Sequence, residues 1–480
     1  MSSLPKHRHY LYNLYDRQLS RDPFPRLPLF QRNLYSCKSF VQRLRLEKQL
    51  EGHQGCVNCI NFSFSGQLLA SGSDDLHLIL WDWARGKVVG KYDTGHVANV
   101  FQAKFMPFTD NQVIVTAARD GQIRLMVLSS TGEVVHSKRV GHHNDSAHKL
   151  SVQPDSPHLF LSCGEDGSVL AMDLREESRT RVLVCRNSKN RRIPLYSIFI
   201  DPSDYNYFAV SGRDQYARIY DRRLLRETSD RVEPVKTYCP HRLQAPEHEY
   251  KQASITCLVY SHNGKELLCS YNDDDIYLFD TTHSTGADYV KRYTGHRNSA
   301  TVKGVNFFGL ESEYIVSGSD CGHVFLWDKS SQEIVQCMEG DEEGVVNCLE
   351  PHPHIPVLAT SGLDHTVKMF TPTAAQPTNL DGLDNLVQEN TSRREEEAEG
   401  TPVGLELFMD FIMRQYRRGL QRENGILNEF SDSSDDDDRA DEDLSEGEES
   451  RELDQSTPSF DNEEPDSEED DRRKERHAHQ

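Results

Sequence analysis

Long hydrophobic runs are absent from the 480-residue sequence, and so are the short motifs that mark common enzyme families. No stretch has the length and apolar character of a signal peptide or a membrane-spanning helix, which predicts a soluble protein without a recognisable secretion signal. A phosphate-binding P-loop, a G-x-S-x-G nucleophile turn and an H-E-x-x-H zinc motif are also missing. We therefore expect a protein that is not an enzyme, that uses no cofactor or metal, and that has no membrane partner.

Cysteine is present, but not in the spacing of a disulfide framework or a metal site. The eleven cysteines are scattered and odd in number, which fits a reducing compartment. Cys56 and Cys59 form the single C-x-x-C pair and fall on a predicted strand, where residues three apart point to opposite faces. Because no second pair exists to complete four zinc ligands, we interpret both as core residues.

Negative charge is concentrated at one end of the chain. Residues 371–480 contain 33 acidic and 12 basic residues, whereas the rest of the chain carries 44 and 42. The near-neutral remainder argues against direct nucleic-acid binding, which needs a basic surface. The acidic end is a candidate contact for histones or other basic proteins.

Tryptophan is scarce, with three residues, but two of them mark a repeat that other large side chains continue. Seven positions follow one another at intervals of 43 to 59 residues: Trp81, Met126, Met172, Tyr220, Phe279, Trp327 and Phe370. Six residues before each lies an aspartate, or once a cysteine: Asp75, Asp120, Asp166, Asp214, Asp273, Cys321 and Asp364. Alternating polar and apolar runs follow these residues, which predicts strands with one buried face.

This pattern resembles the WD-repeat family over residues 41–373, and the resemblance implies an all-β fold, a seven-bladed propeller with four antiparallel strands per blade. Residues 40–50 alternate like an outer strand and would close the ring by completing the seventh blade, since an open edge invites aggregation. The alternative is a strand that leads into the first repeat without completing the seventh blade.

A polar network is expected inside the first blade, built from His53, Ser71, Asp75 and Trp81. Its histidine follows a glycine, and the corresponding pair in the third repeat is Gly141-His142. Repeats four, six and seven depart from the pattern, so we expect apolar packing to hold those blades.

Four segments are expected outside the propeller. Residues 1–40 predict a basic helical arm, in which Leu11 and Leu14 belong to an apolar group. Residues 374–402 are interpreted as a linker. Residues 403–422 predict an amphipathic helix that docks in a groove of a partner, and the alternative is a transient helix in a disordered tail. Residues 423–480 predict a disordered acidic tail, because they are too polar to bury a core.

The third and fourth repeats share an ending that the repeat itself does not require. Each places Asp-x-Arg after its large apolar residue, as Asp173 and Arg175 and again as Asp221 and Arg223. Strand directions place these residues on one face of the disc, opposite the turn aspartates. Two planar guanidinium groups on neighbouring blades could recognise acceptors on another protein. The alternative is an ion pair within each blade.

Two such endings behind a basic helical arm resemble the substrate receptors of cullin-4 ubiquitin ligases. The resemblance implies that Asp173, Arg175, Asp221, Arg223, Leu11 and Leu14 bind the adaptor, damaged-DNA-binding protein 1. The opposite face, with Arg119 and Arg213, would bind an unknown target protein, and the location would be the nucleus and cytoplasm. The competing hypothesis is a WD-repeat scaffold in a chromatin or other nuclear assembly unconnected to ubiquitin.

Overall fold

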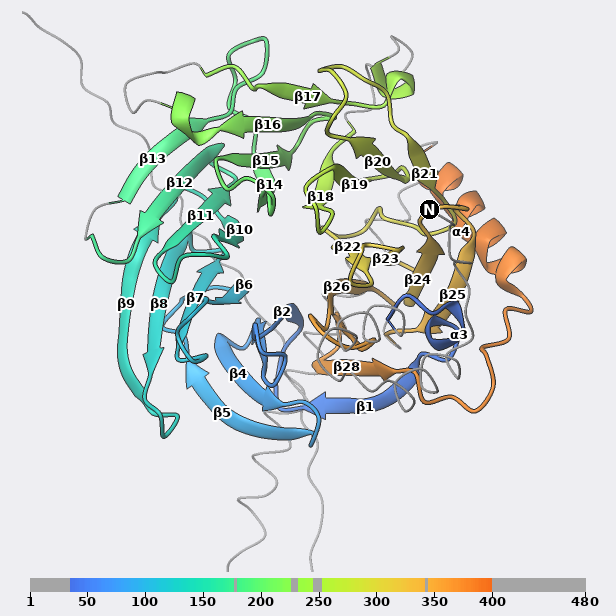
Figure 1. The fold of residues 1–480 in the computed structure, drawn as a ribbon, viewed down its shortest axis with the longest axis horizontal. Coiled ribbons are helices and arrows are strands. Elements are labelled where there is room, and N and C mark those ends of the chain that lie inside the picture. The colour runs from blue at the N-terminus through green and yellow to red at the C-terminus, as the bar shows by residue number, and fades with distance from the viewer. Residues whose placement is uncertain (1–34, 177–178, 226–231, 245–252, 342–343, 399–480) are drawn as a thin grey trace, which may run out of the picture. The chain divides into compact units, whose positions relative to one another are not determined.

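The strands build seven four-stranded antiparallel sheets that stand side by side around a ring (Figure 1). The structure is a computed structural model, and it describes residues 35–176, 179–225, 232–244, 253–341 and 344–398. These all belong to the first of two units, Met1–Ile412, and the second unit is Met413–Gln480. Leu11, Leu14 and the predicted segments 403–422 and 423–480 lie outside the described residues. The predicted all-β, seven-bladed fold is confirmed.

Six blades use four strands that are consecutive in the sequence. Blade one consists of β2 (Val57–Phe62), β3 (Leu69–Ser73), β4 (His77–Asp82) and β5 (Lys87–Asp93). Blade two consists of β6 (Val100–Phe105), β7 (Val113–Ala118), β8 (Gln122–Leu128) and β9 (Val134–His142). Blade three consists of β10 (Ala147–Val152), β11 (Leu159–Gly164), β12 (Ser168–Asp173) and β13 (Arg179–Val184). Blade four consists of β14 (Leu195–Ile200), β15 (Tyr207–Gly212), β16 (Ala217–Asp221) and β17 (Lys236–Tyr238). Blade five consists of β18 (Ile255–Tyr260), β19 (Glu266–Tyr271), β20 (Ile276–Asp280) and β21 (Lys291–Tyr293). Blade six consists of β22 (Val305–Phe308), β23 (Tyr314–Gly318), β24 (His323–Asp328) and β25 (Ile334–Glu339). Short 3-10 helices follow β16 and β17, η1 (Arg222–Leu224) and η2 (His241–Gln244).

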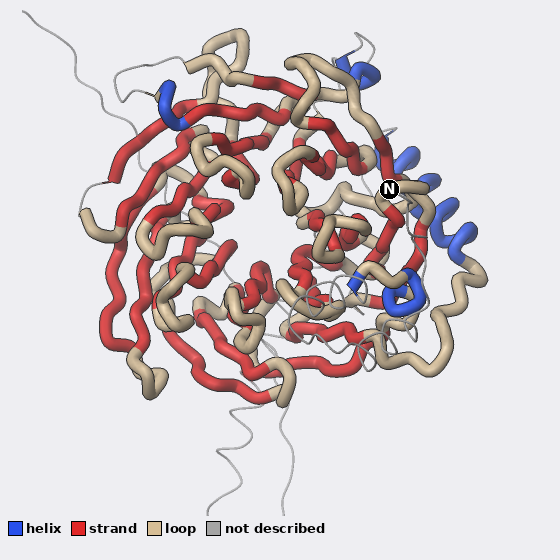
Figure 2. Tube along the Cα trace, in the orientation of Figure 1, coloured by secondary structure: helices blue, strands red, loops and turns tan. Residues whose placement is uncertain are grey.

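Burial falls from the inner strands of a blade to its outer strand. In the first blade β3 is buried throughout, whereas β5 is mostly exposed. The inner strands lie between the neighbouring blades and bury both faces, so their side chains are apolar on both sides. Figure 2 shows strands throughout the ring, with the long helix α4 (Leu383–Ala398) at its rim.

The seventh blade closes the ring with the first strand of the chain. It consists of β26 (Val346–Pro351), β27 (Leu358–Gly362), β28 (Thr366–Thr371) and β1 (Arg45–Glu51). β1 pairs antiparallel with β28, in a register that runs from Arg45 opposite Thr371 to Glu51 opposite Thr366. The predicted closing strand is therefore present, and β28 has no open edge.

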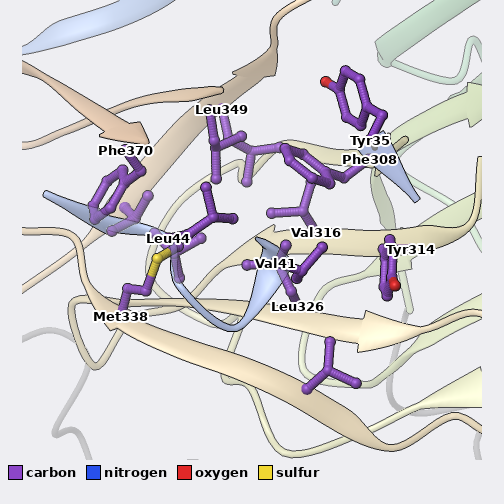
Figure 3. Packing of buried hydrophobic residues seen from close by; sticks show 14 residues of the cluster. Tyr35, Val41, Leu44, Phe308, Tyr314, Val316, Leu326, Met338, Leu349 and Phe370 are labelled. Carbon is purple, nitrogen blue, oxygen red and sulfur yellow. The ribbon is translucent and has the colours of Figure 1, made fainter. Parts of the chain in front are cut away.

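Residues just before β1 pack between the sixth and seventh blades. The short helix α3 (Lys38–Val41) lies here, and Tyr35, Val41 and Leu44 are almost completely buried among side chains of both blades (Figure 3). Tyr35 Oη donates to the carbonyl of His352 at 2.7 Å. The last residues of the predicted N-terminal arm thus belong to the propeller core.

The segment predicted as a linker, 374–402, contains the helix α4 (Leu383–Ala398), which lies against the rim of blades five and six (Figure 1). Leu383 and Leu386 pack on the sixth blade, and Asn390 Nδ2 donates to the carbonyl of Gly295 at 2.9 Å. Arg394 Nη1 pairs with the fully buried Asp275 at 2.7 Å. The linker interpretation missed this helix because charged side chains supply much of its attachment. No helix in the described ranges is both long enough and apolar enough to cross a bilayer.

Candidate functional site

The alternating directions of the strands divide the connections between two faces of the propeller. One face carries the links between first and second strands and between third and fourth strands, including Arg175 and Arg223. We call it the Arg face. The other carries the links between second and third strands and those between blades, including Arg119 and Arg213. We call it the turn face. The two sets of predicted site residues therefore lie on opposite faces.

The first blade contains a chain of hydrogen bonds through the four residues predicted for it. Trp81 Nε1 donates to Ser71 Oγ at 2.8 Å, and Ser71 Oγ lies 2.7 Å from His53 Nε2. His53 Nδ1 lies 3.0 Å from Asp75 Oδ2, so the ring donates to the carboxylate and accepts from the serine. Burial alone would raise the pKa of Asp75, but the hydrogen bond from His53 brings this pKa well below its ordinary value. These residues hold the blade together.

The second and third blades repeat this arrangement with one difference from the sequence prediction. His96 Nδ1 lies 3.1 Å from Asp120 in the second blade. In the third blade His143, not His142 of the Gly-His pair, occupies this place, with Nδ1 3.1 Å from Asp166 and Nε2 2.8 Å from Ser162. His142 is the last residue of β9 and pairs with Gln122, so the next residue, His143, takes the network position.

Blades four, six and seven bury an ion pair in the corresponding turn, in addition to the apolar packing that was expected to be their main support. The pairs are Asp214 with Arg218, Asp320 with Lys303 and Asp364 with Lys368. Lys303 is fully buried and Lys368 is nearly so. In blades four and seven a cation from the chain is thus the partner of the turn carboxylate, whereas in blade six Lys303 pairs with Asp320, which directly precedes the turn residue Cys321.

In the third blade the Asp-x-Arg ending closes into a rigid ring. Asp173 accepts the backbone N–H of Arg175 at 3.0 Å, and its two oxygens accept from Nε at 3.0 Å and Nη2 at 2.6 Å. The bond from Arg175 holds the pKa of Asp173 at about 2. The Arg175 side chain remains 63% exposed. Since Nε and Nη2 form one edge of the guanidinium, the Nη1 edge points away from the carboxylate.

The fourth blade repeats the same geometry. Asp221 accepts from the backbone N–H of Arg223 at 2.9 Å and from its Nε and Nη2 at 2.9 and 2.7 Å. The guanidinium also lies over the ring of Tyr207, 5.5 Å from its centroid, and its side chain is 56% exposed. The ion pair within each blade is therefore present. It is compatible with recognition as well, because both arginines are exposed and held in one orientation.

Exposed apolar side chains accompany these arginines on the Arg face. Phe64, Phe108 and Leu224 are 46%, 77% and 65% exposed, and they lie in first-to-second or third-to-fourth connections of blades one, two and four. The sequence prediction missed them, although each large apolar residue falls in a predicted connection rather than a strand. Together with Arg175 and Arg223 they extend over four consecutive blades.

The centre of the ring contains a cavity of about 310 Å³ that is lined by the inner strands of all seven blades. Lys104 Nζ and Glu350 Oε1 are 3.6 Å apart in it, and Asn61 Nδ2 donates to the same oxygen at 2.8 Å. Within the described parts of the chain, no three His, Cys, Asp or Glu side chains are grouped as metal ligands.

Four segments match the repeat family described as WD domain, G-beta repeat: residues 44–82, 238–280, 287–328 and 332–371. The fold is a seven-bladed propeller, and four segments of it match this repeat. The matched segments cover blades one, five, six and seven, whereas the strand topology identifies blades two to four. The matching model describes a repeat and not an enzyme family.

Several curated proteins are similar to the chain. Protein ALTERED SEED GERMINATION 2 of Arabidopsis thaliana is 32% identical over 327 residues, with 61% of this chain and 42% of that protein covered. DDB1- and CUL4-associated factor 6 of Homo sapiens is 34% identical over 293 residues, with 60% and 34% covered. WD and tetratricopeptide repeats protein 1 of Mus musculus is 32% identical over 280 residues, with 53% and 41% covered. In each of the three, the alignment spans less than half of the relative's own length.

Proposed function

We propose that the chain is a non-catalytic substrate receptor of a cullin-4 E3 ubiquitin ligase. Its Arg face would bind the adaptor, damaged-DNA-binding protein 1, and its turn face would hold the target protein for ubiquitylation. The observation that carries this proposal is the pair of exposed, oriented arginines on consecutive blades, Arg175 and Arg223. The name of the similar human factor, which contains DDB1 and CUL4, supports it.

The geometry suits a protein interface for two physical reasons. An exposed Asp–Arg pair adds little to stability, but it fixes the guanidinium and so reduces the conformational entropy lost when a partner binds. Exposed Phe108 and Leu224 supply apolar area beside the arginines, and arginine and aromatic side chains are enriched among residues that dominate binding energy.

The N-terminal arm would be the second adaptor contact, through Leu11 and Leu14. Tyr35 is bonded to His352, which lies in the first-to-second connection of the seventh blade. The chain therefore enters the described propeller at the Arg face, the same face as Arg175 and Arg223. This entry point supports a shared adaptor surface.

Three finer proposals accompany this function. Within the receptor family, the eighth numbered member is the proposed counterpart, because runs such as LASGSDDLHLILWDW resemble it outside generic repeat positions. A nuclear and cytoplasmic location is proposed, which imaging of the tagged chain would test. The acidic residues after 423 would contact a histone or another basic protein.

Affinity purification of the tagged full chain from cells tests the receptor function. Wild type should recover the adaptor and cullin-4, and Arg175→Ala, Arg223→Ala should lose both. The matched control, Arg191→Ala, Arg192→Ala, removes two exposed arginines from the turn face and should behave as wild type. Absence of the adaptor from the wild-type sample, or its unchanged recovery with Arg175→Ala, Arg223→Ala, would overturn the proposal.

A further inference from the structure

A basic hairpin projects from the turn face between the third and fourth blades. It links β13 to β14 and carries Arg186, Lys189, Arg191 and Arg192, the last three exposed. Its backbone is ordered by a bridge between Arg186 and Arg192 and by a bond from Asn190 N to the carbonyl of Asn187 at 2.9 Å. The four cations are therefore held on a fixed loop.

This hairpin is continuous with the turns that contain Arg119 and Arg213. Arg213 N donates to the carbonyl of Pro194, directly after the hairpin, at 2.9 Å. A Cβ added to Gly167, in the turn of the third blade, would lie 3.2 Å from Arg192 Cβ. Arg119 and Arg213 both act electrostatically on Glu165 in that same turn. The turns of blades two, three and four and the hairpin thus form one surface.

Positive charge on this surface is not neutralised by ion pairs. Across the described residues, none of the six cations Arg119, Arg186, Lys189, Arg191, Arg192 and Arg213 forms a salt bridge. The exposed or half-buried carboxylates among them are Asp120, Asp145, Glu165 and Asp166. Asp120 and Asp166 are bonded to His96 and His143, and Glu165 is bonded to His148 Nε2 at 2.6 Å. The six cations outnumber these four carboxylates, three of which are already bonded to a histidine, so the surface attracts an anionic ligand.

A half-buried aromatic group lies beside these cations, at the start of three inner strands. Phe101 and His148 stack with ring centroids 5.0 Å apart, and Tyr196 contacts His148 edge-on with centroids 5.1 Å apart. These rings come from blades two, three and four, the same blades that carry the cations. The surface therefore offers apolar contact area to a ligand as well as positive charge.

The other blades limit how far an anionic ligand can extend. In blades five to seven the carboxylates of Asp274, Asp275, Asp320 and Asp364 are each paired with a cation of the chain itself. A long polyanion crossing the disc would leave the unpaired cations and meet these carboxylates. A short acidic segment fits the cationic half alone.

We propose that the turn face of blades two to four, with the 186–192 hairpin, Arg119 and Arg213, docks an acidic segment of the target protein. Asp or Glu side chains of the segment would pair with the arginines, and a neighbouring apolar side chain would rest on Phe101, His148 and Tyr196. Identifying the occupant as the target rests on the proposed receptor function, whereas the acidic chemistry rests on the surface itself.

Fluorescence anisotropy with the purified full chain tests this docking surface. The probe is a short fluorescein-labelled peptide of alternating glutamate and glycine with one central phenylalanine, measured at about 0.1 M salt. Wild type should bind it, and Arg191→Glu, Arg192→Glu should weaken binding about tenfold or more, as should Arg119→Glu, Arg213→Glu. The matched control is Lys138→Glu, Arg139→Glu on exposed positions of β9, which changes net charge equally and should leave the affinity near that of wild type.

Equal affinities in the hairpin variant and the β9 variant would overturn the proposal, as would absence of binding by wild type. A single-stranded oligothymidylate of equal charge is the second probe. If it binds more tightly than the peptide, the surface is a nucleic-acid site and the proposal fails. Adaptor recovery is measured on the same variants. It should persist in Arg191→Glu, Arg192→Glu, so that failure of peptide docking is distinguishable from failure of the receptor function.

Discussion

His53 and His296 occupy the same place in the first and sixth blades, and the residue at the turn decides how each ring is held. Asp75 accepts from His53, whereas Cys321 stands at the corresponding turn of the sixth blade. Both nitrogens of His296 lack hydrogen-bond partners within the described structure, and the ring rests edge-on against Trp327 with centroids 5.6 Å apart. Burial lowers the pKa of His296 to about 4.

Acid should therefore destabilise the protein through His296. The unfolded histidine takes up a proton below about pH 6.5, and the folded one resists until about pH 4. Its contribution to the free energy of unfolding should fall by about 3 kcal/mol as the pH drops through this window, and should level off below it. Denaturant unfolding of wild type and His296→Leu across this range measures the difference. If the free energy of unfolding of the two proteins showed the same dependence on pH, the lowered pKa assigned to His296 would be contradicted.

Ser71 should matter more than the serine at the corresponding position of the sixth blade. Ser71 Oγ joins Trp81 to His53, so Ser71→Ala leaves two buried ring nitrogens unsatisfied and should cost about 2–3 kcal/mol. Ser317 Oγ contacts backbone carbonyls instead, and Ser317→Ala should cost less than about 1 kcal/mol. Midpoints of urea unfolding measure both. Equal losses would show that the network adds nothing to the first blade.

Among the elements, local sequence patterns predicted the strands, whereas the position of the helix α4 depends on long-range contacts. The alternation of apolar residues and the spacing of the repeats were sufficient to predict seven blades and the closing strand β1, because the burial pattern of a strand depends on residues that are close in the sequence. The helix α4 was missed, since its main partners, Asp275 and Gly295, are about a hundred residues away. The network residue is His143 and not His142 because β9 continues through His142, and spacing alone does not reveal where that strand ends.

Attachment of α4 should depend on Arg394. Its partner Asp275 is fully buried and keeps only Arg292 in Arg394→Ala, so we expect a loss of about 1–2 kcal/mol. Hydrogen exchange of the α4 and β21 amides should become faster. Arg393→Ala, at an exposed position on the same helix, is the control and should leave exchange unchanged. Unchanged exchange in Arg394→Ala would mean that the other contacts, those of Leu383, Leu386 and Asn390, hold the helix without Arg394.

The propeller ring is closed by pairing of the first and last strands of the propeller sequence. Its two faces differ in the side chains that they expose. The resemblance to WD repeats predicted the opposition of Arg175 and Arg223 to Arg119 and Arg213. It did not predict the exposed Phe108 and Leu224, or the 186–192 hairpin, because connections are not constrained by the repeat.

Ring closure should require β1. Deletion of residues 1–51 removes β1 and the buried Tyr35, leaves β28 as an open edge, and should yield protein that aggregates. Deletion of residues 1–34 keeps both and should leave the melting temperature within a few degrees of wild type. Size-exclusion chromatography and thermal unfolding distinguish the outcomes. A monomeric, stable protein after deletion of 1–51 would contradict closure by β1.

The affinity of the purified full chain for purified damaged-DNA-binding protein 1 tests the central claim most directly. Biolayer interferometry of wild type, of Arg175→Ala, Arg223→Ala and of the turn-face control Arg191→Ala, Arg192→Ala gives three dissociation constants. The Arg-face variant should bind about a hundredfold more weakly, since two arginines at the centre of an interface contribute on the order of 3 kcal/mol together. The turn-face control should match wild type. Equal affinity for all three proteins, or equal loss in both variants, would contradict the assignment of the adaptor to the Arg face.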